Sequence, residues 1–456
     1  MKNFDAIIIG TGTAGQTAAF DLAAEDYNVA IIENSDTPGG VCALRGCQAK
    51  KWFYEVSELV ARCHHLLGLG VTSLPKVDWQ QILLEKNKFT SEVPESTINN
   101  LEGSGITFIE GKATFIDRST VIVNGLKLSA DSFIVATGAQ PRTLSFDGNE
   151  HMITSDEFLE LKALPDRIAF VGGGFISFEF AHFVARLGSS RGAIHILQAG
   201  DRVLSPFDGD MVRQLVEASE AEGIRIYTDV SIVSIEKTDS GYTVMTESGE
   251  NVEVDLVVNG AGRSPNIESL NLLAAGVDFT EKGISVDHNM KTSNAKIFAV
   301  GDCAKSLMLA RVADMEAHVA AKAVVAGKKG EVPAGIDYSA TPAVLFTYPQ
   351  LGMVGKTEEQ LQEENIQYRK SYDTQLSWPT YRRVGLKYAA YKILVDEDDQ
   401  ILGAHILSDN TTGLLNTFKQ AMIDKIPVAD LHRNNIMSPY PSRESDILYM
   451  LSPFVE

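Results

Sequence analysis

The chain has 456 residues, of which 44% are apolar, and this length predicts two to four domains with large cores. Its formal charge of −20 argues against nucleic acid or an anionic membrane as a partner. The first residues lead into an apolar strand without the layout of a signal peptide, and no stretch has the roughly 18 apolar residues of a membrane span. Because there are only four cysteines, we expect a cytoplasmic protein in a reducing compartment.

The N-terminal stretch has the pattern of a dinucleotide site. An apolar run at residues 5–9 leads into GTGTAG and a helical pattern, and a second apolar run ends at Glu33. Gly10 would form the turn, Gly12 would admit a pyrophosphate, and Gly15 would let the helix pack on its strand. An acid about 20 residues past the first glycine can accept hydrogen bonds from a ribose hydroxyl. The alternative is a plain glycine turn in a parallel sheet.

Residues 39–51, GGVCALRGCQAKK, contain two cysteines close enough to react with each other. In a regular helix, Cys42 and Cys47 would lie roughly 7.5 Å apart along the axis, beyond the usual disulfide limit of about 7 Å. The chain between them must therefore be tightened or irregular, which Gly46 permits. A strained, accessible disulfide is typical of a redox-active pair.

The surroundings of the pair also favour reactivity. Three basic residues flank the thiols, Arg45, Lys50 and Lys51. Positive charge and the N-terminus of a helix over residues 50–67 would lower a thiol pKa. The alternatives are a structural disulfide and half of a zinc site. Only Cys63 and Cys303 remain, and neither lies in a second paired motif.

The rest of the first module reads as helices followed by strands. Helical patterns run to about residue 69 and over residues 79–101. His64 and His65 face different sides of the first helix, so we interpret them as surface or packing residues and expect no metal site. Alternation over residues 106–135 predicts a β-meander, and residues 140–166 read as a linker.

A second dinucleotide pattern follows over residues 168–197, with GGGFIS as its turn. Ser177 stands at the third small position, where it is small enough for close packing. Gln198 stands where an acid would accept the ribose hydroxyls, and it provides no cation for a 2′-phosphate unless Arg202 turns in. The choice between NADH and NADPH is therefore open.

The remaining elements return to the first module and then form a third unit. A second meander is expected around residues 242–245 and 256–258, and an apolar strand then ends at Gly301 and Asp302. Such an acid can hydrogen-bond a sugar-like chain, or it can cap a helix. From about residue 338 the chain lacks a glycine-rich turn, and we expect strands at 343–346, 391–395 and 401–405 and a helix at 414–423.

Together these motifs resemble the pyridine nucleotide–disulfide oxidoreductase family, which includes glutathione reductase, dihydrolipoamide dehydrogenase and mercuric reductase. The resemblance covers the full chain and rests on GTGTAG with Glu33, GGVCALRGCQAKK, VATGA, GGGFIS with Glu179, GAGRSPN, VGDCA and VLFTYPQLGMVGKTEEQ. Glutathione reductase is the closest named relative.

The resemblance implies an α/β fold with two Rossmann-like dinucleotide-binding domains, for FAD and for NAD(P), and a C-terminal α+β dimerisation domain. Residues 1–145 and 262–335 would bind FAD, residues 146–261 would bind NAD(P), and residues 336–456 would form a homodimer.

The resemblance also implies the route of the electrons. Hydride would pass from NADPH or NADH to FAD, and then through the Cys42–Cys47 disulfide to a small disulfide substrate. Cys42 would attack the substrate, Cys47 would lie against the flavin, and Lys50 would pair with Glu179 near the flavin. The implied FAD contacts are Gly10, Gly12, Gly15, Glu33, Gly40, Lys50, Ala113, Ala136, Thr137, Gly138, Gly301, Asp302 and Ala310. The implied NAD(P) contacts are Gly172, Gly174, Ile176, Glu179, Gln198, Arg202 and Gly262.

The sharpest departure from the family lies near the C-terminus, where Tyr440 replaces the histidine that disulfide reductases carry before a proline. With an unperturbed pKa of about 10, tyrosine can donate a proton but is a poor general base. Its alternative role is packing at an interface. Mercuric reductases resemble this chain in having a tyrosine there, but they also end in a cysteine pair, which this sequence lacks.

We therefore expect an FAD-dependent NAD(P)H:disulfide oxidoreductase. The first alternative is a reductase of metal ions, quinones or other electrophiles, as in mercuric reductase. The second is a redox-sensing flavoprotein whose cysteine pair reports to another protein.

Overall fold

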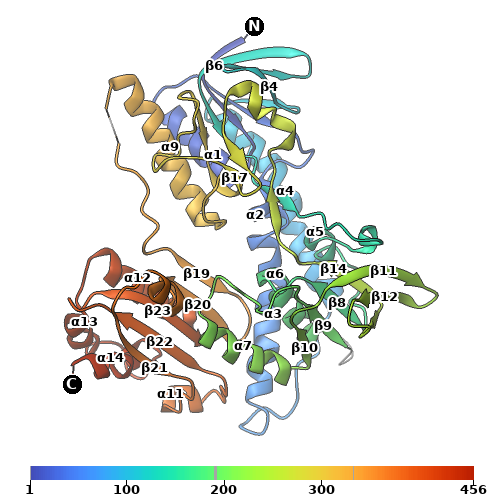
Figure 1. Ribbon diagram of the computed structural model, residues 1–456, viewed down its shortest axis with the longest axis vertical. Helices are drawn as coiled ribbons and strands as arrows, with labels where there is room; N and C mark the ends of the chain where they lie inside the picture. The colour runs from blue at the N-terminus through green and yellow to red at the C-terminus, as the bar shows by residue number, and fades with distance from the viewer. Residues whose placement is uncertain (1, 189–192, 332, 456) are drawn as a thin grey trace. The chain divides into compact units, whose positions relative to one another are not determined.

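The computed structural model describes residues 2–188, 193–331 and 333–455 and divides the chain into two compact units (Figure 1). Unit 1 consists of Met1–Trp52, Ile82–Arg142 and Arg263–Asp337. Unit 2 consists of Phe53–Gln81, Thr143–Gly262 and Tyr338–Glu456. Two of the unit boundaries, after Trp52 and after Gln81, fall within the long helices α3 (Cys47–His65) and α4 (Trp79–Gly103). The ranges of the three domains expected from the sequence stay a prediction.

Unit 1 is built on a seven-stranded sheet in the order β3-β2-β1-β6-β5-β4, with β18 paired to β6. Five strands are parallel: β1 (Lys2–Ile9), β2 (Val29–Glu33), β3 (Thr107–Glu110), β6 (Leu126–Val135) and β18 (Ile297–Ala299). Two more, β4 (Thr114–Asp117) and β5 (Thr120–Val123), form an antiparallel meander with β6. The prediction that residues 106–109 belong to the meander is wrong, because β3 pairs in parallel with β2.

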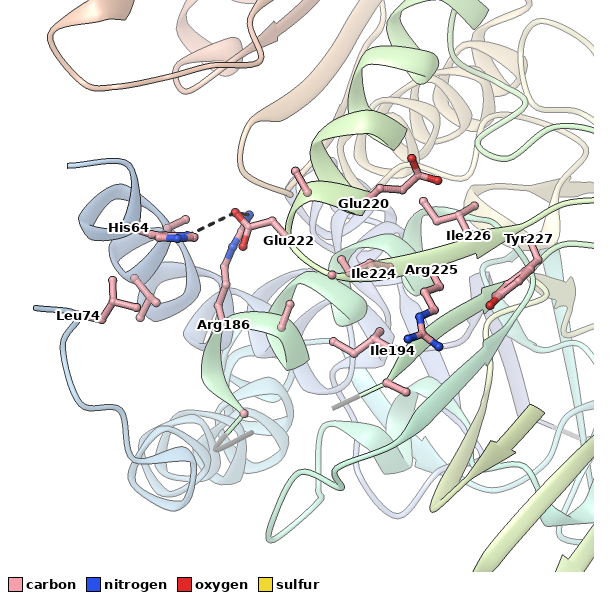
Figure 2. Close-up of a pocket in the computed structure, with 17 residues that line it drawn as sticks. His64, Leu74, Arg186, Ile194, Glu220, Glu222, Ile224, Arg225, Ile226 and Tyr227 are labelled. Atoms are coloured by element: carbon pink, nitrogen blue, oxygen red, sulfur yellow. Dashed lines mark ion pairs between the residues drawn. The ribbon is translucent and has the colours of Figure 1, made fainter. Parts of the chain in front are cut away.

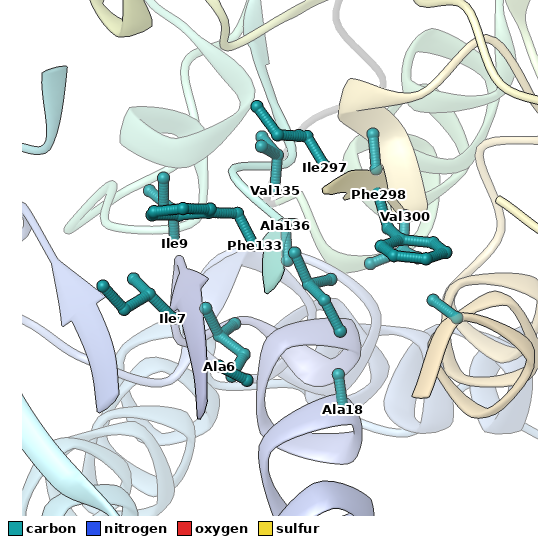
Figure 3. Close-up of a cluster of buried hydrophobic side chains, with 14 of the residues drawn as sticks. Ala6, Ile7, Ile9, Ala18, Phe133, Val135, Ala136, Ile297, Phe298 and Val300 are labelled. Carbon is teal, nitrogen blue, oxygen red and sulfur yellow. The ribbon is translucent and has the colours of Figure 1, made fainter. Parts of the chain in front are cut away.

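The core of unit 1 lies where β1, β6 and β18 meet the first helix. Figure 3 shows Ile7 of β1, Phe133 of β6 and Ile297 of β18 together on one side of the strands, with Ala18 of α1 (Thr13–Ala24) at the lower edge of the cluster, on the side of Ala6. All four side chains are fully buried. The small side chain of Ala18 lets the helix axis approach the sheet, and α1 also packs beside α9 (Ala310–Lys329), as Figure 1 shows.

Short elements complete unit 1. They are α2 (Gly40–Leu44), α8 (Leu272–Ala275), the 3₁₀ turns η2 (Glu268–Leu270) and η3 (Gly301–Cys303), and the antiparallel pairs β7 (Ala139–Pro141) with β15 (Arg263–Pro265) and β16 (Phe279–Thr280) with β17 (Gly283–Ile284).

Unit 2 contains a second parallel sheet, in the order β10-β9-β8-β14. Its strands are β8 (Ile168–Val171), β9 (Ile194–Leu197), β10 (Ile224–Tyr227) and β14 (Leu256–Asn259), and its main helices are α6 (Phe175–Leu187) and α7 (Gly209–Ala221). A separate antiparallel sheet has β11 (Ile232–Thr238), β12 (Gly241–Thr246) and β13 (Val252–Val254). Residues 256–258 were predicted in this meander, but they belong to β14, which pairs in parallel with β8.

The predicted linker over residues 140–166 carries structure of its own. It includes the end of β7, a 3₁₀ turn η1 (Asn149–His151) and α5 (Ser155–Phe158). The short helix α5 begins with a capping box, in which the side chains of Thr154 and Glu157 satisfy each other's backbone N–H groups. Proline and glycine therefore mark turns here and not an unstructured connection.

The C-terminal part of unit 2 is a five-stranded antiparallel sheet covered by helices. The strand order is β19-β20-β23-β22-β21. The strands are β19 (Pro342–Leu345), β20 (Gln350–Gly355), β21 (Arg369–Asp373), β22 (Ala390–Val395) and β23 (Ile401–Ser408). The helices are α10 (Glu358–Glu363), α11 (Pro379–Arg382), α12 (Thr411–Ile423), α13 (Val428–Asn435) and α14 (Ile447–Val455), with η4 (Glu444–Asp446) between the last two. The predicted strands and the helix at 414–423 are confirmed.

Candidate redox and dinucleotide-binding site

The carboxyl ends of the parallel strands in unit 1 bring the predicted FAD residues to one edge of the sheet. Ile9 pairs with Val135, and Val135 pairs in turn with Ala299. The residues that follow these strands, among them Gly10 and Ala136, therefore lie at the same edge. In parallel α/β sheets, ligands bind at this edge.

The glycines of the first turn are required for different reasons. A Cβ on Gly10 would lie 2.4 Å from the carbonyl oxygen of Ala136, and one on Gly15 would lie 1.9 Å from that of Gly10. The packing of the protein itself therefore demands both. A Cβ on Gly12 would meet only the Cα of Gly40, at 3.9 Å, among the atoms that the structure describes. The space in front of Gly12 fits a ligand that approaches the backbone closely.

Glu33 closes this turn from the end of β2. Its Oε2 accepts hydrogen bonds from the backbone N–H of Thr11 at 2.9 Å and from the Thr11 hydroxyl at 2.5 Å. The hydroxyl oxygen of Thr11 accepts in turn from the N–H of Gly39 at 3.1 Å. Thr11 was not singled out from the sequence, and it links the glycine turn to the cysteine segment. The predicted contact of Glu33 with a ribose stays a prediction.

The two cysteines flank a break between helices. Helix α2 ends at Leu44 and α3 begins at Cys47, so the predicted irregular junction is confirmed. A Cβ on Gly46 would lie 2.9 Å from the carbonyl oxygen of Val41, and this close approach requires glycine. Cys42 is half-buried and Cys47 is exposed. Their hydrogen bond, together with burial, raises the pKa of Cys42.

The charges that act on Cys42 come partly from α9. Asp314 raises the pKa of Cys42 further, and Arg311 lowers it. Arg311 donates to Asp314 at 2.9 Å, and Asp314 also accepts from the Thr13 hydroxyl. Arg45 donates to Thr37 at 2.8 Å. Neither Arg311 nor Asp314 could be predicted from the sequence, because they are remote from the cysteines along the chain.

The segment after β18 continues the same edge. The N–H of Gly301 donates to Glu316 at 2.6 Å, which ties the 3₁₀ turn η3 to α9. Burial raises the pKa of Asp302, and the guanidinium of Arg263 opposes this rise. Gly138, which follows β6, has a φ of +66°, and a Cβ there would meet no described atom within 4 Å. These positions suit contacts with a polar ligand.

The second glycine turn repeats the first with two substitutions. Its strand ends coincide in the same way, because Val171 pairs with both Leu197 and Asn259. The Gln198 Oε1 accepts from the N–H of Gly173 at 2.7 Å, as Glu33 accepts from Thr11. The Ser177 hydroxyl donates to the carbonyl oxygen of Gly172 at 2.5 Å.

Both substitutions therefore preserve the turn. Gly172 has a φ of +100°, and a Cβ there would lie 2.5 Å from the Cα of Ala261. A Cβ on Gly174 would meet only the carbonyl oxygen of Gly260, at 3.7 Å, in the described part of the chain. As at Gly12, the open side of the middle glycine fits an approaching nucleotide. Ile176, on α6, is buried, and Gly262 adopts a φ of +103°.

Two other residues predicted to contact NAD(P), Arg202 and Glu179, make hydrogen bonds to other parts of the protein. Arg202 donates to Glu359 at 3.2 Å and to the carbonyl oxygens of Ser205 and Phe207. Glu179 is 1% exposed and accepts from the N–H of Phe346 at 2.9 Å. The predicted pairing of Lys50 with Glu179 joins residues of different units and stays a prediction.

Tyr440 is 77% exposed and follows α13 in a segment with two other exposed apolar side chains, Ile436 and Met437. Its predicted role as proton donor or interface residue stays a prediction.

Three alanines are predicted to contact FAD. Ala113 and Ala136 are both buried, and Ala310 is the first residue of α9.

A cavity of about 830 Å³ in unit 2 is lined by residues outside the second glycine turn (Figure 2). It is lined by charged groups that pair with one another, since Glu222 approaches His64 at 3.9 Å and Arg186 at 3.6 Å. His65 Nδ1 lies 2.9 Å from the carbonyl oxygen of Gly385, in keeping with a packing role. Within the described ranges, no group of three or more His, Cys, Asp or Glu side chains is arranged to hold a metal ion.

Comparisons with known proteins place these features in a family. Residues 4–317 match the family described as pyridine nucleotide-disulphide oxidoreductase, and residues 341–446 match its dimerisation domain. The chain belongs to this family. Its members use FAD and NAD(P)H, and the predicted fold of two dinucleotide-binding domains with a dimerisation domain is confirmed. No helix among the described residues is long and apolar enough to cross a membrane.

Individual relatives of this oxidoreductase differ in their acceptors. The chain is 31% identical over 448 residues to a mercuric reductase of Lysinibacillus sphaericus, covering 96% of this chain and 80% of the relative. It is 31% identical over 432 residues to a glutathione reductase of Nostoc sp., and the match covers 91% of this chain and 92% of the relative. Among solved structures, the HOCl-induced flavoprotein disulfide reductase RclA from Escherichia coli matches with a TM-score of 0.86 and 26% identity. The match covers 98% of this chain and 99% of RclA. A Cu(II) complex of that reductase has also been solved.

Proposed function

We propose that this oxidoreductase uses NADH or NADPH to reduce a small disulfide through FAD and the Cys42–Cys47 pair. The observation that supports this most is the contact of the two thiols at the α2–α3 junction. The junction adjoins the first glycine turn, because a Cβ on Gly40 would lie 2.4 Å from the Cα of Gly12. The redox pair therefore sits beside the proposed pyrophosphate position.

FAD, when bound, supplies the capacity to accept a hydride from NAD(P)H and to pass two electrons to a disulfide. The reduced pair then acts on the substrate in two exchanges. The Cys42 thiolate attacks one sulfur of the substrate disulfide, and the other half leaves as a thiolate that takes up a proton. Cys47 next attacks the Cys42 sulfur, which releases the second half and restores the Cys42–Cys47 disulfide. One substrate disulfide becomes two thiols.

The surroundings of Cys42 control the first exchange. Cys42 must lose its proton before it attacks, and its hydrogen bond to Cys47 and its burial oppose this loss. Arg311 favours the thiolate. We propose that Tyr440 donates a proton to the leaving thiolate, since a phenol donates at neutral pH but is a poor base. That role would require a homodimer formed through residues 336–456.

The residues proposed to hold FAD all belong to unit 1: Gly10, Gly12, Gly15, Glu33, Gly40, Lys50, Ala113, Ala136, Thr137, Gly138, Gly301, Asp302 and Ala310. The residues proposed to hold the nicotinamide nucleotide are Gly172, Gly174, Ile176, Glu179, Gln198 and Gly262.

A second candidate function is the reduction of a metal ion. It is favoured by Tyr440, which replaces the histidine of disulfide reductases, and by relatives named mercuric reductase and a Cu(II) complex of RclA. In this alternative the same thiols would pass electrons to the ion.

An acceptor comparison tests both candidates. Purified protein is reduced anaerobically with NADH or NADPH, and consumption of the nicotinamide is then followed with glutathione disulfide, lipoamide, Hg(II) or Cu(II). We expect turnover with a disulfide, and a loss of roughly 100-fold or more in Cys42→Ser and Cys47→Ser. Cys63→Ser is the matched control and should retain full activity. Turnover with metal ions alone would favour the second candidate, and a protein that consumed neither nicotinamide would favour a redox sensor.

A further inference from the structure

The loop between Gln198 and α7 is held by hydrogen bonds to α10, one of the helices that cover the C-terminal sheet of the same unit. Helix α10 starts with a capping box formed by Thr357 and Gln360, which fixes its first turn. Two adjacent acids in that turn then connect to the loop, one at Arg202 and the other, through Lys392, at Asp208. Glu359 accepts from Arg202 at 3.2 Å, and Glu358 lies 2.7 Å from Lys392, which pairs with Asp208 at 2.9 Å.

The contact between Glu359 and Arg202 is close and partly buried. The Oε1 of Glu359 accepts from both Arg202 and the N–H of Gly209, the latter at 2.8 Å. A Cβ on Gly209 would lie 2.7 Å from Glu359 Oε1 and 3.2 Å from Arg202 Nη1, so the three groups are packed together. The Arg202 Nε and the Glu359 Oε2 are buried and lack a hydrogen-bond partner among the described atoms.

Among the described residues of the loop 199–208, this arrangement leaves no cation free to bind a 2′-phosphate at the proposed ribose end. A 2′-phosphate is recognised by cationic side chains, and arginine is the most suitable of them. Gln198 offers only an uncharged amide, and its oxygen is already used by Gly173. The nearest arginine along the chain is Arg202, whose charge is opposed by Glu359 and whose Nη2 donates to the carbonyl oxygens of Ser205 and Phe207.

We propose that Glu359 is a positioning residue that holds Arg202 away from a 2′-phosphate and thereby makes the enzyme prefer NADH to NADPH. The proposal rests on the proposed function, in that residues 172–202 would bind the nicotinamide nucleotide. It assigns a role in cofactor choice to a residue of the C-terminal sheet region, remote in sequence from the glycine turn.

The experiment compares kcat/KM for NADH and NADPH in the wild-type protein and in three variants. In Glu359→Gln, we expect the ratio of kcat/KM for NADPH to kcat/KM for NADH to rise roughly threefold to tenfold. This is the size of effect expected when one partly exposed charge pair is broken. Glu363→Gln removes the same charge from an exposed position on the same helix and should leave the ratio unchanged. In the double variant Glu359→Gln, Arg202→Gln, the gain should disappear.

A binding measurement separates this inference from the proposed function. Calorimetry compares the affinities for adenosine 2′,5′-bisphosphate and ADP, and Glu359→Gln should strengthen binding of the bisphosphate alone. A wild-type preference for NADPH, an unchanged ratio of affinities in Glu359→Gln, or an equal gain in the double variant would overturn the inference. A protein that oxidised neither nicotinamide would contradict the proposed function, while the two affinities would still test the role of Glu359.

Discussion

At Gly12 the backbone faces space that the described chain leaves open, whereas at Gly40 it faces another segment. Gly12 has a φ of −64°, which any residue can adopt, and a Cβ there would have ordinary contacts. Gly40 has a φ of +75°, and a Cβ there would lie 2.4 Å from the Cα of Gly12. The fold therefore requires glycine at residue 40, whereas at residue 12 we propose that the ligand requires it.

Substitution by alanine should separate these two roles. We expect Gly12→Ala to keep the thermal midpoint of the FAD-free protein and to weaken FAD binding roughly tenfold or more, since its methyl group occupies the ligand's approach. Gly40→Ala should destabilise the FAD-free protein by about 1–3 kcal/mol through overpacking. Calorimetry of the apoprotein and titration with FAD measure the two effects. Normal FAD affinity in Gly12→Ala would show that this glycine does not face the cofactor.

At the scale of elements, one buried lysine joins a helix, a strand and a second helix. Lys392 of β22 is 1% exposed and donates to Asp208 at the N-terminus of α7, and to Asp210 and Glu358. Burial alone would raise the pKa of Glu358, but hydrogen bonds from Lys370 and Lys392 bring it down to about 2. A buried cation among carboxylates is costly to remove, because the acids then lose their partner.

Lys392→Met should therefore destabilise unit 2 by about 3 kcal/mol at neutral pH. The carboxylate of Glu358 has a lowered pKa when folded, so its stabilisation is present above about 4.5, its ordinary value, and is lost as the pH falls towards about 2. The difference in thermal midpoint between wild type and Lys392→Met should shrink over that range. Lys370→Met removes a more exposed partner of Glu358, and it should lower the free energy of unfolding by less than about 1 kcal/mol. Equal effects of the two variants would contradict the proposed importance of burial.

Sequence periodicity was sufficient to predict many of the strands and helices, although not α5 in the predicted linker, and it did not predict which strands pair. Residues 106–109 and 256–258 are predicted in meanders, but they lead into or lie in β3 and β14 of the parallel sheets, because alternation or an apolar run does not identify the neighbouring strand. The glycine turns and the cysteine pair could be predicted since each is contiguous in sequence. Arg311 and Glu359 could not, because only the folded chain brings them to Cys42 and Arg202.

For the whole molecule, the exposed apolar side chains near the C-terminus bear on assembly. The match to a dimerisation domain over residues 341–446 includes the segment that contains Ile436, Met437 and Tyr440. Met437 is 87% exposed in the single chain. Large apolar side chains that gather on a surface mark protein contacts.

We expect Met437→Lys to weaken a homodimer roughly tenfold or more, because it would place a charge in an apolar contact. Leu273→Lys is the matched control, since Leu273 is 80% exposed but lies outside the dimerisation domain. Sedimentation equilibrium of both variants measures the dissociation constant. A wild-type protein that remained monomeric, or equal weakening by both substitutions, would contradict dimerisation through this segment.

The pairing of β18 with β6 has a consequence for synthesis on the ribosome. The two strands are neighbours in the sheet of unit 1, yet the whole of Thr143–Gly262 is translated between them. The parallel sheet β10-β9-β8-β14 lies entirely within that insertion, so it can form while the first sheet still lacks a strand. Closing such a long loop is slow relative to local pairing. The nascent chain should therefore acquire its capacity to retain FAD only after residues 297–303 emerge, later than the capacity of the insertion to fold.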